Sequence, residues 1–165
     1  MLVSHKQTGL IAVLVLVIGL NACGFKLRGS GALRPEMRQV YIAEEYLESN
    51  FGRKLNQALQ ARGGPVVTNK EQATGILELT EPEKNRRLLS VNTLAQARDY
   101  LLALTVKLTL KDAQGKAVLS NQKVEVRREL VADPSNVLGS DQEAQRLFAE
   151  MEQELVQAIL MRLRQ

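Results

Sequence analysis

The strongest hydrophobic pattern in the chain lies between residues 100 and 111. Tyr100 and every even position from 102 to 110 are apolar, while the odd positions carry mainly lysine and threonine from 105 onward. Alternation with period two predicts a β-strand that buries one face. Residues 112–115, Asp-Ala-Gln-Gly, have turn chemistry, and residues 118–130 form a second, more polar strand pattern. We therefore predict a long antiparallel hairpin.

Two further segments place apolar residues at helical spacing. Ser49 is suited to cap the first helix, and Gly63 is suited to a left-handed cap at its end. The second helix is predicted from Asp141 to Arg164, because Ser140 and Glu143 match a Ser-x-x-Glu capping box. The two apolar stripes consist of Phe51, Leu55, Ala58 and Leu59, and of Ala144, Leu147, Phe148, Met151, Leu155, Ala158, Ile159 and Leu163.

Three short segments, 39–43, 66–67 and 75–81, have strand character, and Pro82 interrupts the third. Helices and a sheet that are each apolar on one side must cover one another. We therefore predict an α+β fold. It is a two-layer sandwich in which two amphipathic helices pack on one face of a roughly four-stranded sheet, in the order β-α-β-β-β-α.

The N-terminus has the pattern of an export signal. Lys6 precedes an uncharged apolar run of 12 residues, Gly9 to Leu20, which is shorter than the about 20 that a membrane-spanning helix needs. Leu20-Asn21-Ala22-Cys23 resembles the lipobox of bacterial lipoproteins, in which the cysteine is lipidated and becomes the first residue. We predict a signal peptide over residues 1–22, a lipid-anchored tether over 23–35 and one domain over 36–165. A short membrane anchor is the alternative.

The residue after the cysteine bears on the location. Gly24 is not the aspartate that typically retains such lipoproteins in the inner membrane. The expected location is therefore the outer membrane, with the protein lipid-anchored on its periplasmic side.

The amino-acid composition excludes several classes of function. The chain of 165 residues has a single histidine, His5, and a single cysteine, Cys23, so residues 24–165 contain neither. A Cys/His zinc site, an internal disulfide and a nucleophile activated by histidine cannot be built there. We expect no enzymatic activity, no metal and no cofactor; an envelope hydrolase is the enzymatic alternative.

Basic residues are concentrated in and before the predicted hairpin. Residues 84–128 hold ten Lys or Arg and three acidic residues, whereas the whole chain has 22 and 18. A solvated sheet face would explain this excess, since lysines discourage the pairing of sheet edges. The alternative is a phosphate-binding cluster near one end of the hairpin, because a planar guanidinium fits phosphate oxygens. Its candidate residues are Arg86, Arg87, Arg98, Arg127 and Arg128.

A pI of about 9.4 would also suit a protein that binds nucleic acid. The chain has only three tyrosines, three phenylalanines and no tryptophan for base stacking, and export would remove it from nucleic acid. We therefore expect no nucleic-acid partner. A phosphorylated glycolipid of the envelope is the anionic ligand to consider.

The residues from the cysteine onward carry a resemblance. Cys23-Gly24-Phe25-Lys26-Leu27-Arg28 is similar to the start of the LptE family of lipopolysaccharide-assembly lipoproteins, which typically begin with Cys-Gly-aromatic-x-Leu-Arg. The order and spacing of the predicted elements also resemble that family over nearly all of the mature chain. The resemblance implies a non-enzymatic outer-membrane lipoprotein that plugs the β-barrel LptD, supports its assembly, and contacts lipopolysaccharide on its way to the cell surface.

Two positions depart from what the family implies. Basic residues credited with lipopolysaccharide binding in the family would fall near Thr93 and at Ser140, and neither residue is basic. Those roles are therefore not carried over, and the arginine cluster is the candidate in their place. The alternative function is that of an auxiliary, periplasm-facing lipoprotein of another envelope lipid-transport system of the ABC type.

Overall fold

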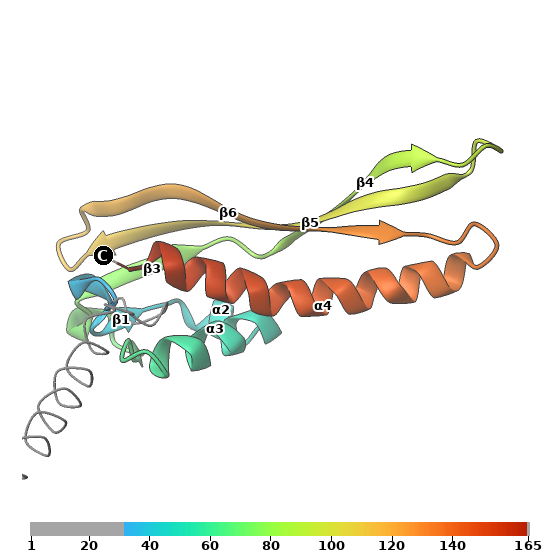
Figure 1. Cartoon of the computed structure of the whole chain (residues 1–165). Coiled ribbons are helices and arrows are strands. Elements are labelled where there is room, and N and C mark those ends of the chain that lie inside the picture. The colour runs from blue at the N-terminus through green and yellow to red at the C-terminus, as the bar shows by residue number, and fades with distance from the viewer. Residues whose placement is uncertain (1–31, 165) are drawn as a thin grey trace, which may run out of the picture. The chain divides into compact units, whose positions relative to one another are not determined.

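The computed structural model describes residues 32–164, so the predicted signal peptide, Cys23 and most of the predicted tether lie outside the described residues. Its strands form one mixed sheet in the order β2-β1-β3-β5-β4, and β6 also pairs with β5 (Figure 1). In chain order the elements are η1 (Pro35–Met37), β1 (Val40–Tyr41), α2 (Glu44–Leu47), α3 (Asn50–Gln60), β2 (Val66–Val67), η2 (Lys70–Gln72), β3 (Gly75–Leu79), β4 (Glu83–Val91), β5 (Ala97–Asp112), β6 (Ala117–Val131) and α4 (Val137–Arg162).

β5 is the central strand, and it follows the predicted alternation. Its even-numbered side chains from Leu102 to Leu110 are each at most 1% exposed. β6 runs antiparallel beside it, from Val131 opposite Asp99 to Ala117 opposite Lys111. Gly115 closes the turn with a φ of 82°, a conformation that favours glycine. The predicted hairpin is confirmed.

The other edge of β5 is divided between β3 and β4. β3 pairs with the end of β5 that carries Leu108 to Asp112, and β4 pairs with the end that carries Ala97 to Thr105. Pro82 lies between the two strands, where the sequence predicted the interruption. The sequence pattern predicted no strand over residues 83–91, where the structure has β4. Eight of the nine residues of β4 are exposed, so backbone pairing forms this strand without an alternating pattern of burial.

α3 begins and ends as the sequence predicted. The Ser49 hydroxyl accepts a hydrogen bond from the Gly52 amide at 2.9 Å, which satisfies one N–H group of the first turn. The helix ends at Gln60, and Gly63 follows with a φ of 77°. Three of the four predicted stripe residues, Phe51, Leu55 and Leu59, are buried, and Ala58 is partly buried.

α4 begins about one turn earlier than predicted, and the predicted capping box is wrong. Asn136 is the N-cap, and its side-chain oxygen accepts a hydrogen bond from the Gly139 amide at 3.0 Å. Ser140 lies inside the helix, where its buried hydroxyl accepts from the Asp133 amide at 2.9 Å. Glu143 pairs with Arg146 on the surface instead. The physical reason is that Asn136 offers an acceptor one turn earlier, which leaves Ser140 to tie the preceding loop to the helix.

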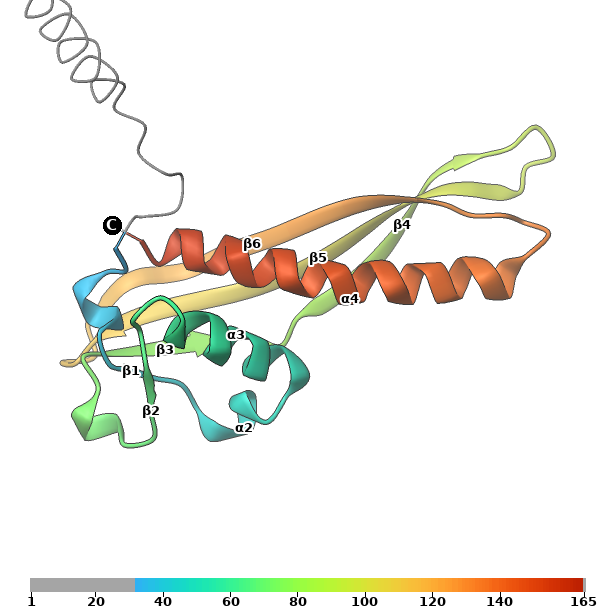
Figure 2. The same cartoon turned by 60° about the horizontal axis from the view of Figure 1, so that its bottom comes forward.

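Both main helices pack on the same face of the sheet (Figures 1 and 2). α3 lies at the β1–β3 end, and α4 runs along β5 and β6. One continuous cluster of buried side chains joins both helices to the sheet. The predicted two-layer α+β fold is therefore confirmed, with six strands in place of about four.

Among residues 32–164, no element covers the opposite face of the sheet along β4, β5 and β6. Within this same range, no helix combines the length and the apolarity needed to cross a bilayer.

Candidate functional site

Four of the five predicted arginines fall at one level of the sheet but on two faces. Arg86 of β4 and Arg128 of β6 both align with Leu102 of β5, whose side chain is buried on the side of the helices. Aligned residues of neighbouring strands share a face, and successive residues of one strand alternate between faces. Arg87 and Arg127 therefore belong to the uncovered face. The structure divides the predicted cluster into two pairs.

The pair on the helix side is held by acidic residues of α4. Arg128 Nη1 lies 2.6 Å from Glu150 Oε2, and Arg128 Nη2 pairs with Glu154. Hydrogen bonds to Glu154 and Glu150 raise the pKa of the Arg128 guanidinium. Arg86 Nη1 lies 2.7 Å from Asp141 Oδ1, and its Cζ is 3.8 Å from the centre of the Tyr100 ring. These two arginines brace the outer strands against α4.

Arg98 belongs to neither pair. It is the second residue of β5, and its side chain is 61% exposed. Its Nε is 3.9 Å from Asp99 Oδ1, which is too far for a hydrogen bond. Its guanidinium is therefore open to solvent near the β4–β5 turn.

Arg87 and Arg127 line a groove of about 520 Å³ on the uncovered face of the sheet. We call it the open groove. Its walls come from β4, β5 and β6, and its apolar floor includes Leu101 and Ala103. Its charged lining residues are the cations Arg87, Lys107, Lys123 and Arg127 and the carboxylates Glu83 and Glu125. Four cations against two carboxylates make the groove electropositive.

Glu125 organises the charges of the groove. Its carboxylate lies 2.5 Å from Lys123 Nζ, pairs with Arg127, and accepts a hydrogen bond from the Thr105 hydroxyl at 3.0 Å. Hydrogen bonding to Lys123, then to Thr105 and Arg127, lowers the pKa of Glu125 to about 2, so it stays ionised at neutral pH. One carboxylate shared by two cations leaves a positive excess. Neither Arg87 nor Lys107 forms an ion pair with any residue of the described range.

Sequence reasoning missed the two lysines of the groove. Lys107 stands at an odd position of β5, and Lys123 aligns directly with it on β6. The period-two pattern already assigned Lys107 to the polar face. Only the register of the hairpin, which the sequence does not fix, brings Lys123 beside it.

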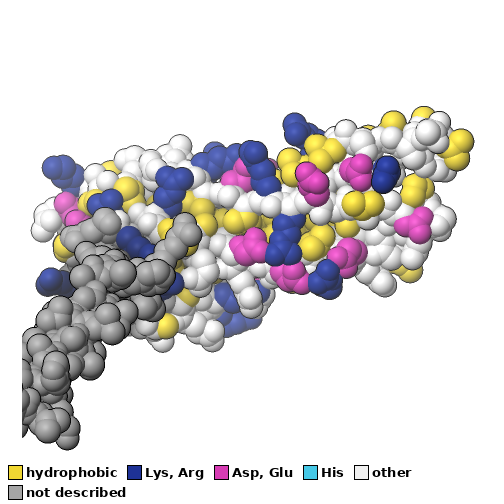
Figure 3. Space-filling view, viewed as in Figure 1, with side chains coloured by type: hydrophobic (Ala, Val, Ile, Leu, Met, Phe, Trp, Pro, Cys, Tyr) yellow, Lys and Arg dark blue, Asp and Glu magenta, His cyan; other side chains and the backbone are white. Residues whose placement is uncertain are grey.

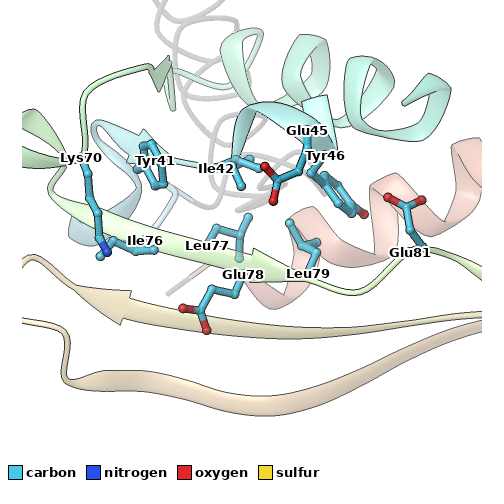
Figure 4. Close-up of a pocket in the computed structure, with 11 residues that line it drawn as sticks. Tyr41, Ile42, Glu45, Tyr46, Lys70, Ile76, Leu77, Glu78, Leu79 and Glu81 are labelled. Carbon is cyan, nitrogen blue, oxygen red and sulfur yellow. The ribbon is translucent and has the colours of Figure 1, made fainter. Parts of the chain in front are cut away.

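A second concavity of about 310 Å³ lies between α2 and β3 (Figure 4). Glu45, Glu78 and Glu81 line it together with one cation, Lys70. Burial, and to a lesser degree Glu81, raise the pKa of the Tyr46 phenol, so that phenol stays protonated. Its hydroxyl donates to the Thr80 carbonyl at 3.3 Å. The acidic lining disfavours an anion here, so the open groove is the better candidate for a phosphate-bearing ligand.

Cys23, the predicted lipidation site, lies outside the described residues. Within residues 32–164, no group of three or more His, Cys, Asp or Glu side chains is placed to hold a metal ion.

The described unit is a two-layer α+β fold whose uncovered sheet face carries an excess of cations, an arrangement suited to anionic ligands. The chain belongs to the LptE family, because the family model described as lipopolysaccharide-assembly matches residues 37–163. Membership of this family confirms the expectation of a non-enzymatic protein and implies a role in lipopolysaccharide assembly.

Individual relatives agree with this assignment. The LPS-assembly lipoprotein LptE of Photorhabdus laumondii is 22% identical over 156 residues, which cover 92% of this chain and 85% of the relative. Lipoprotein B of Nitrosomonas europaea has a similar structure, with a TM-score of 0.65 and 26% identity over 83% of this chain and 88% of that one. Rare lipoprotein B of Shewanella oneidensis shares the fold, with a TM-score of 0.65 and 21% identity over 74% of this chain and 91% of that one.

Proposed function

We propose that this protein is an outer-membrane lipoprotein that partners and plugs the LptD β-barrel and helps to assemble lipopolysaccharide into the outer leaflet at the cell surface. The observation that carries the proposal is the match to the lipopolysaccharide-assembly family over residues 37–163. The named lipopolysaccharide-assembly lipoprotein among the relatives supports it, since the likeness extends over 92% of this chain.

The membrane attachment is proposed at Cys23. Its place after Leu20-Asn21-Ala22 fits lipidation, and each buried CH₂ of an acyl chain contributes about 0.8 kcal/mol to anchoring. Several acyl chains on one cysteine would hold the domain stably at a membrane. With Gly24 next to the cysteine, the proposed site of anchoring is the periplasmic side of the outer membrane.

The polar character of the uncovered sheet face supports a place inside a barrel. The lumens of outer-membrane barrels are polar and hydrated, so a plug needs polar and charged side chains on the faces that meet the wall. The uncovered face offers Thr105, Lys107, Lys123, Glu125 and Arg127, all from β5 and β6. The even-numbered apolar side chains of β5 from Leu102 to Leu110 are turned toward the helices, whereas Leu101 and Ala103 lie in the groove.

The open groove is the proposed contact for lipopolysaccharide. Phosphate groups of a glycolipid would meet Arg87 and Arg127, with Arg98 further along the sheet, because guanidinium forks match phosphate oxygens. Lys107 and Lys123 add charge beside them. Arg86 and Arg128 keep the role of bracing α4, since their guanidinium groups are already paired with its carboxylates.

The test is a detergent pull-down of the tagged, lipidated protein from its own outer membrane, with the copurifying proteins identified by mass. We expect a large β-barrel in a near one-to-one amount. Subunits of an inner-membrane transporter without a barrel would overturn the proposal and favour the auxiliary lipoprotein of an ABC-type system. A Cys23→Ser variant should be lost from the membrane fraction, which checks the anchor separately.

A further inference from the structure

Four arginines lie at the end of the domain where the described chain begins and ends. Leu33 forms an isolated antiparallel bridge with Arg164. The Arg34 amide donates to the Leu163 carbonyl at 3.1 Å. Figure 2 shows the C-terminus and the start of the described chain together at this end. We call the four residues the terminal arginines; they are Arg34, Arg38, Arg162 and Arg164.

None of the terminal arginines has a carboxylate partner. No ion pair among residues 32–164 includes any of them, whereas Arg86, Arg128 and Arg146 all pair with acidic residues of α4. The two segments that carry them, 32–38 and 155–164, contain one acidic residue, Glu36. Figure 3 shows mainly Lys and Arg among the charged side chains at this end. The end is therefore electropositive.

Two of the four guanidinium groups have an unsatisfied donor. The Nε atoms of Arg34 and Arg164 are buried without a hydrogen-bond partner, and they are the only such side-chain nitrogen or oxygen atoms among residues 32–164. A buried N–H group without an acceptor costs free energy, and the cost is larger in a charged group. Both residues are only partly buried as a whole, so each guanidinium also has an open side. Phosphate oxygens are acceptors that match such a planar fork.

The chain before residue 32 determines which phosphates are near. Cys23, the proposed lipidation site, precedes Ala32 by nine residues. An extended chain spans at most about 3.6 Å per residue, so Ala32 lies within about 32 Å of the lipidated residue. Residues 24–31 include Lys26 and Arg28 and no acidic residue. A tether this short keeps lipid headgroups at a high effective concentration around the terminal arginines, so individually weak contacts become populated.

We propose that the terminal arginines bind the phosphates of anionic phospholipids in the leaflet that holds the Cys23 lipid. This inference rests on the proposed lipidation of Cys23 and goes beyond it: the acyl chains hold the protein at the membrane, and the arginines set the direction in which the domain points. An anionic membrane surface attracts Lys and Arg within about a Debye length.

This contact would orient the whole domain. β5 has 16 residues and spans about 50 Å from the β4–β5 turn to the end that carries the terminal arginines. With the terminal arginines on the headgroups, the β4–β5 turn points away from the leaflet. A domain held by its lipid alone would instead sample many directions.

The β5–β6 turn gives a probe position beside the terminal arginines. η1 adjoins the end of β5, because a Cβ at Gly75 would meet both Glu36 O at 2.5 Å and Lys111 O at 3.0 Å. The turn that follows carries one acidic and one basic side chain, Asp112 and Lys116, so it adds no net charge. A dye in this turn therefore reports on the terminal arginines without replacing any of them.

Energy transfer to the membrane measures the direction of the domain. The full, lipidated protein is held in nanodiscs of phosphatidylcholine, alone or mixed with phosphatidylglycerol, with a trace of acceptor-labelled lipid. Because Cys23 is the only cysteine and carries the lipid, Gln114→Cys or Leu94→Cys gives a single free thiol for the donor dye. We expect phosphatidylglycerol to raise the ratio of transfer at residue 114 to transfer at residue 94 at least about twofold. Raising the salt concentration should remove this change.

Two exposed members of the set give the variant that disturbs the fold least. Arg38→Gln/Arg162→Gln should lose at least about half of the response to phosphatidylglycerol, because two of the four guanidinium groups are removed. Arg53→Gln/Arg146→Gln is the matched control, since it removes the same charge from exposed positions on α3 and α4. It should respond like wild type.

The buried donors are tested by a variant that keeps the charge. Arg34→Lys/Arg164→Lys retains two positive charges but lacks the planar fork and its Nε–H group. Its response to phosphatidylglycerol should fall at least about twofold, because a point charge forms no bidentate contact with phosphate. Thermal unfolding shows whether this variant folds; if it does not, the Arg38/Arg162 variant still decides the proposal.

The outcomes separate this inference from the proposed anchor. Equal transfer ratios in the two lipid mixtures, or an Arg38→Gln/Arg162→Gln variant that responds like wild type, would overturn the role of the terminal arginines and leave the Cys23 anchor standing. Competition by inorganic phosphate at constant ionic strength would also overturn it, because the site would then prefer the free anion to a headgroup. Protein that enters neither kind of nanodisc would remove the proposed anchor, and this inference with it.

Discussion

Arg86 and Arg87 are neighbours in the chain but lie on opposite faces of β4. Arg86 faces α4 and pairs with Asp141, whereas Arg87 faces the open groove, where it forms no ion pair within residues 32–164. The same division separates Arg128, which pairs with Glu150 and Glu154, from Arg127. Residues of identical type therefore have different surroundings: Arg86 and Arg128 connect the sheet to α4, whereas Arg87 and Arg127 line the open groove, where Arg127 shares the Glu125 carboxylate with Lys123.

This division gives a prediction at the level of single side chains. Replacing both groove arginines, Arg87→Ala with Arg127→Ala, should weaken binding of lipopolysaccharide about tenfold at low salt, because two donors to phosphate are lost. Raising the salt concentration should weaken wild type more than the variant, since salt screens exposed charges. Titration of each protein with lipopolysaccharide at two ionic strengths measures both effects.

The matched control for that variant removes the same charge from the helix layer. Arg53→Ala with Arg146→Ala changes two exposed arginines on α3 and α4, outside the lining of the groove. It should bind like wild type. If the groove variant also bound like wild type at low salt, the groove would not be the contact for phosphate.

Two variants at the start of α4 test whether Asn136 or a capping box at Ser140 caps the helix. Asn136→Ala should lower the free energy of unfolding by about 1 kcal/mol, because the Gly139 amide loses the acceptor 3.0 Å away. Glu143→Ala should cost less, since Glu143 makes only an exposed pair with Arg146, and such pairs contribute about 0.2–1 kcal/mol. Urea unfolding of the two variants gives the comparison. A larger cost for Glu143→Ala would favour the capping box at Ser140.

The elements show which parts of the fold the sequence could predict. β5 was predictable because each even position from 102 to 110 contributes to the core, which leaves a period-two signal in the chain. β4 was not, because its side chains are nearly all exposed and its position depends on pairing with β5. The start of α4 was misplaced because Ser-x-x-Glu is a local pattern, whereas the contact of Ser140 with Asp133 depends on the path of the preceding loop.

The candidate site was predictable in composition but not in arrangement. The excess of Lys and Arg over residues 84–128 is visible in the sequence, and it marks the strands that form the open groove. The faces on which Arg86 and Arg87 lie follow only from the pairing of β4 with β5. The partners of Arg128 come from α4, 22 and 26 residues further along the chain, and no local pattern reports that contact.

In the described unit as a whole, the buried core and the exposed apolar side chains lie in different regions. The largest fully buried side chains include Leu55 of α3, Leu104 of β5 and Leu155 of α4, and all belong to the one cluster that joins both layers. Seven of the eight large apolar side chains that are exposed among residues 32–164 lie outside this cluster, in the second half of β4, in the β4–β5 turn, at the end of β6 or in the first turn of α4. The packing of the domain therefore contributes least to stability at this end of the sheet.

This contrast predicts an uneven pattern of hydrogen exchange along β5. Amides of residues 104–110 should exchange only by global unfolding, because β6 pairs along one edge, β3 and β4 pair with most of the other, and the even side chains are buried. Amides of residues 91–97 should exchange at least about a hundredfold faster, by local opening of the β4–β5 turn. Exchange followed by mass spectrometry on the purified protein measures both segments, and equal rates would contradict this division.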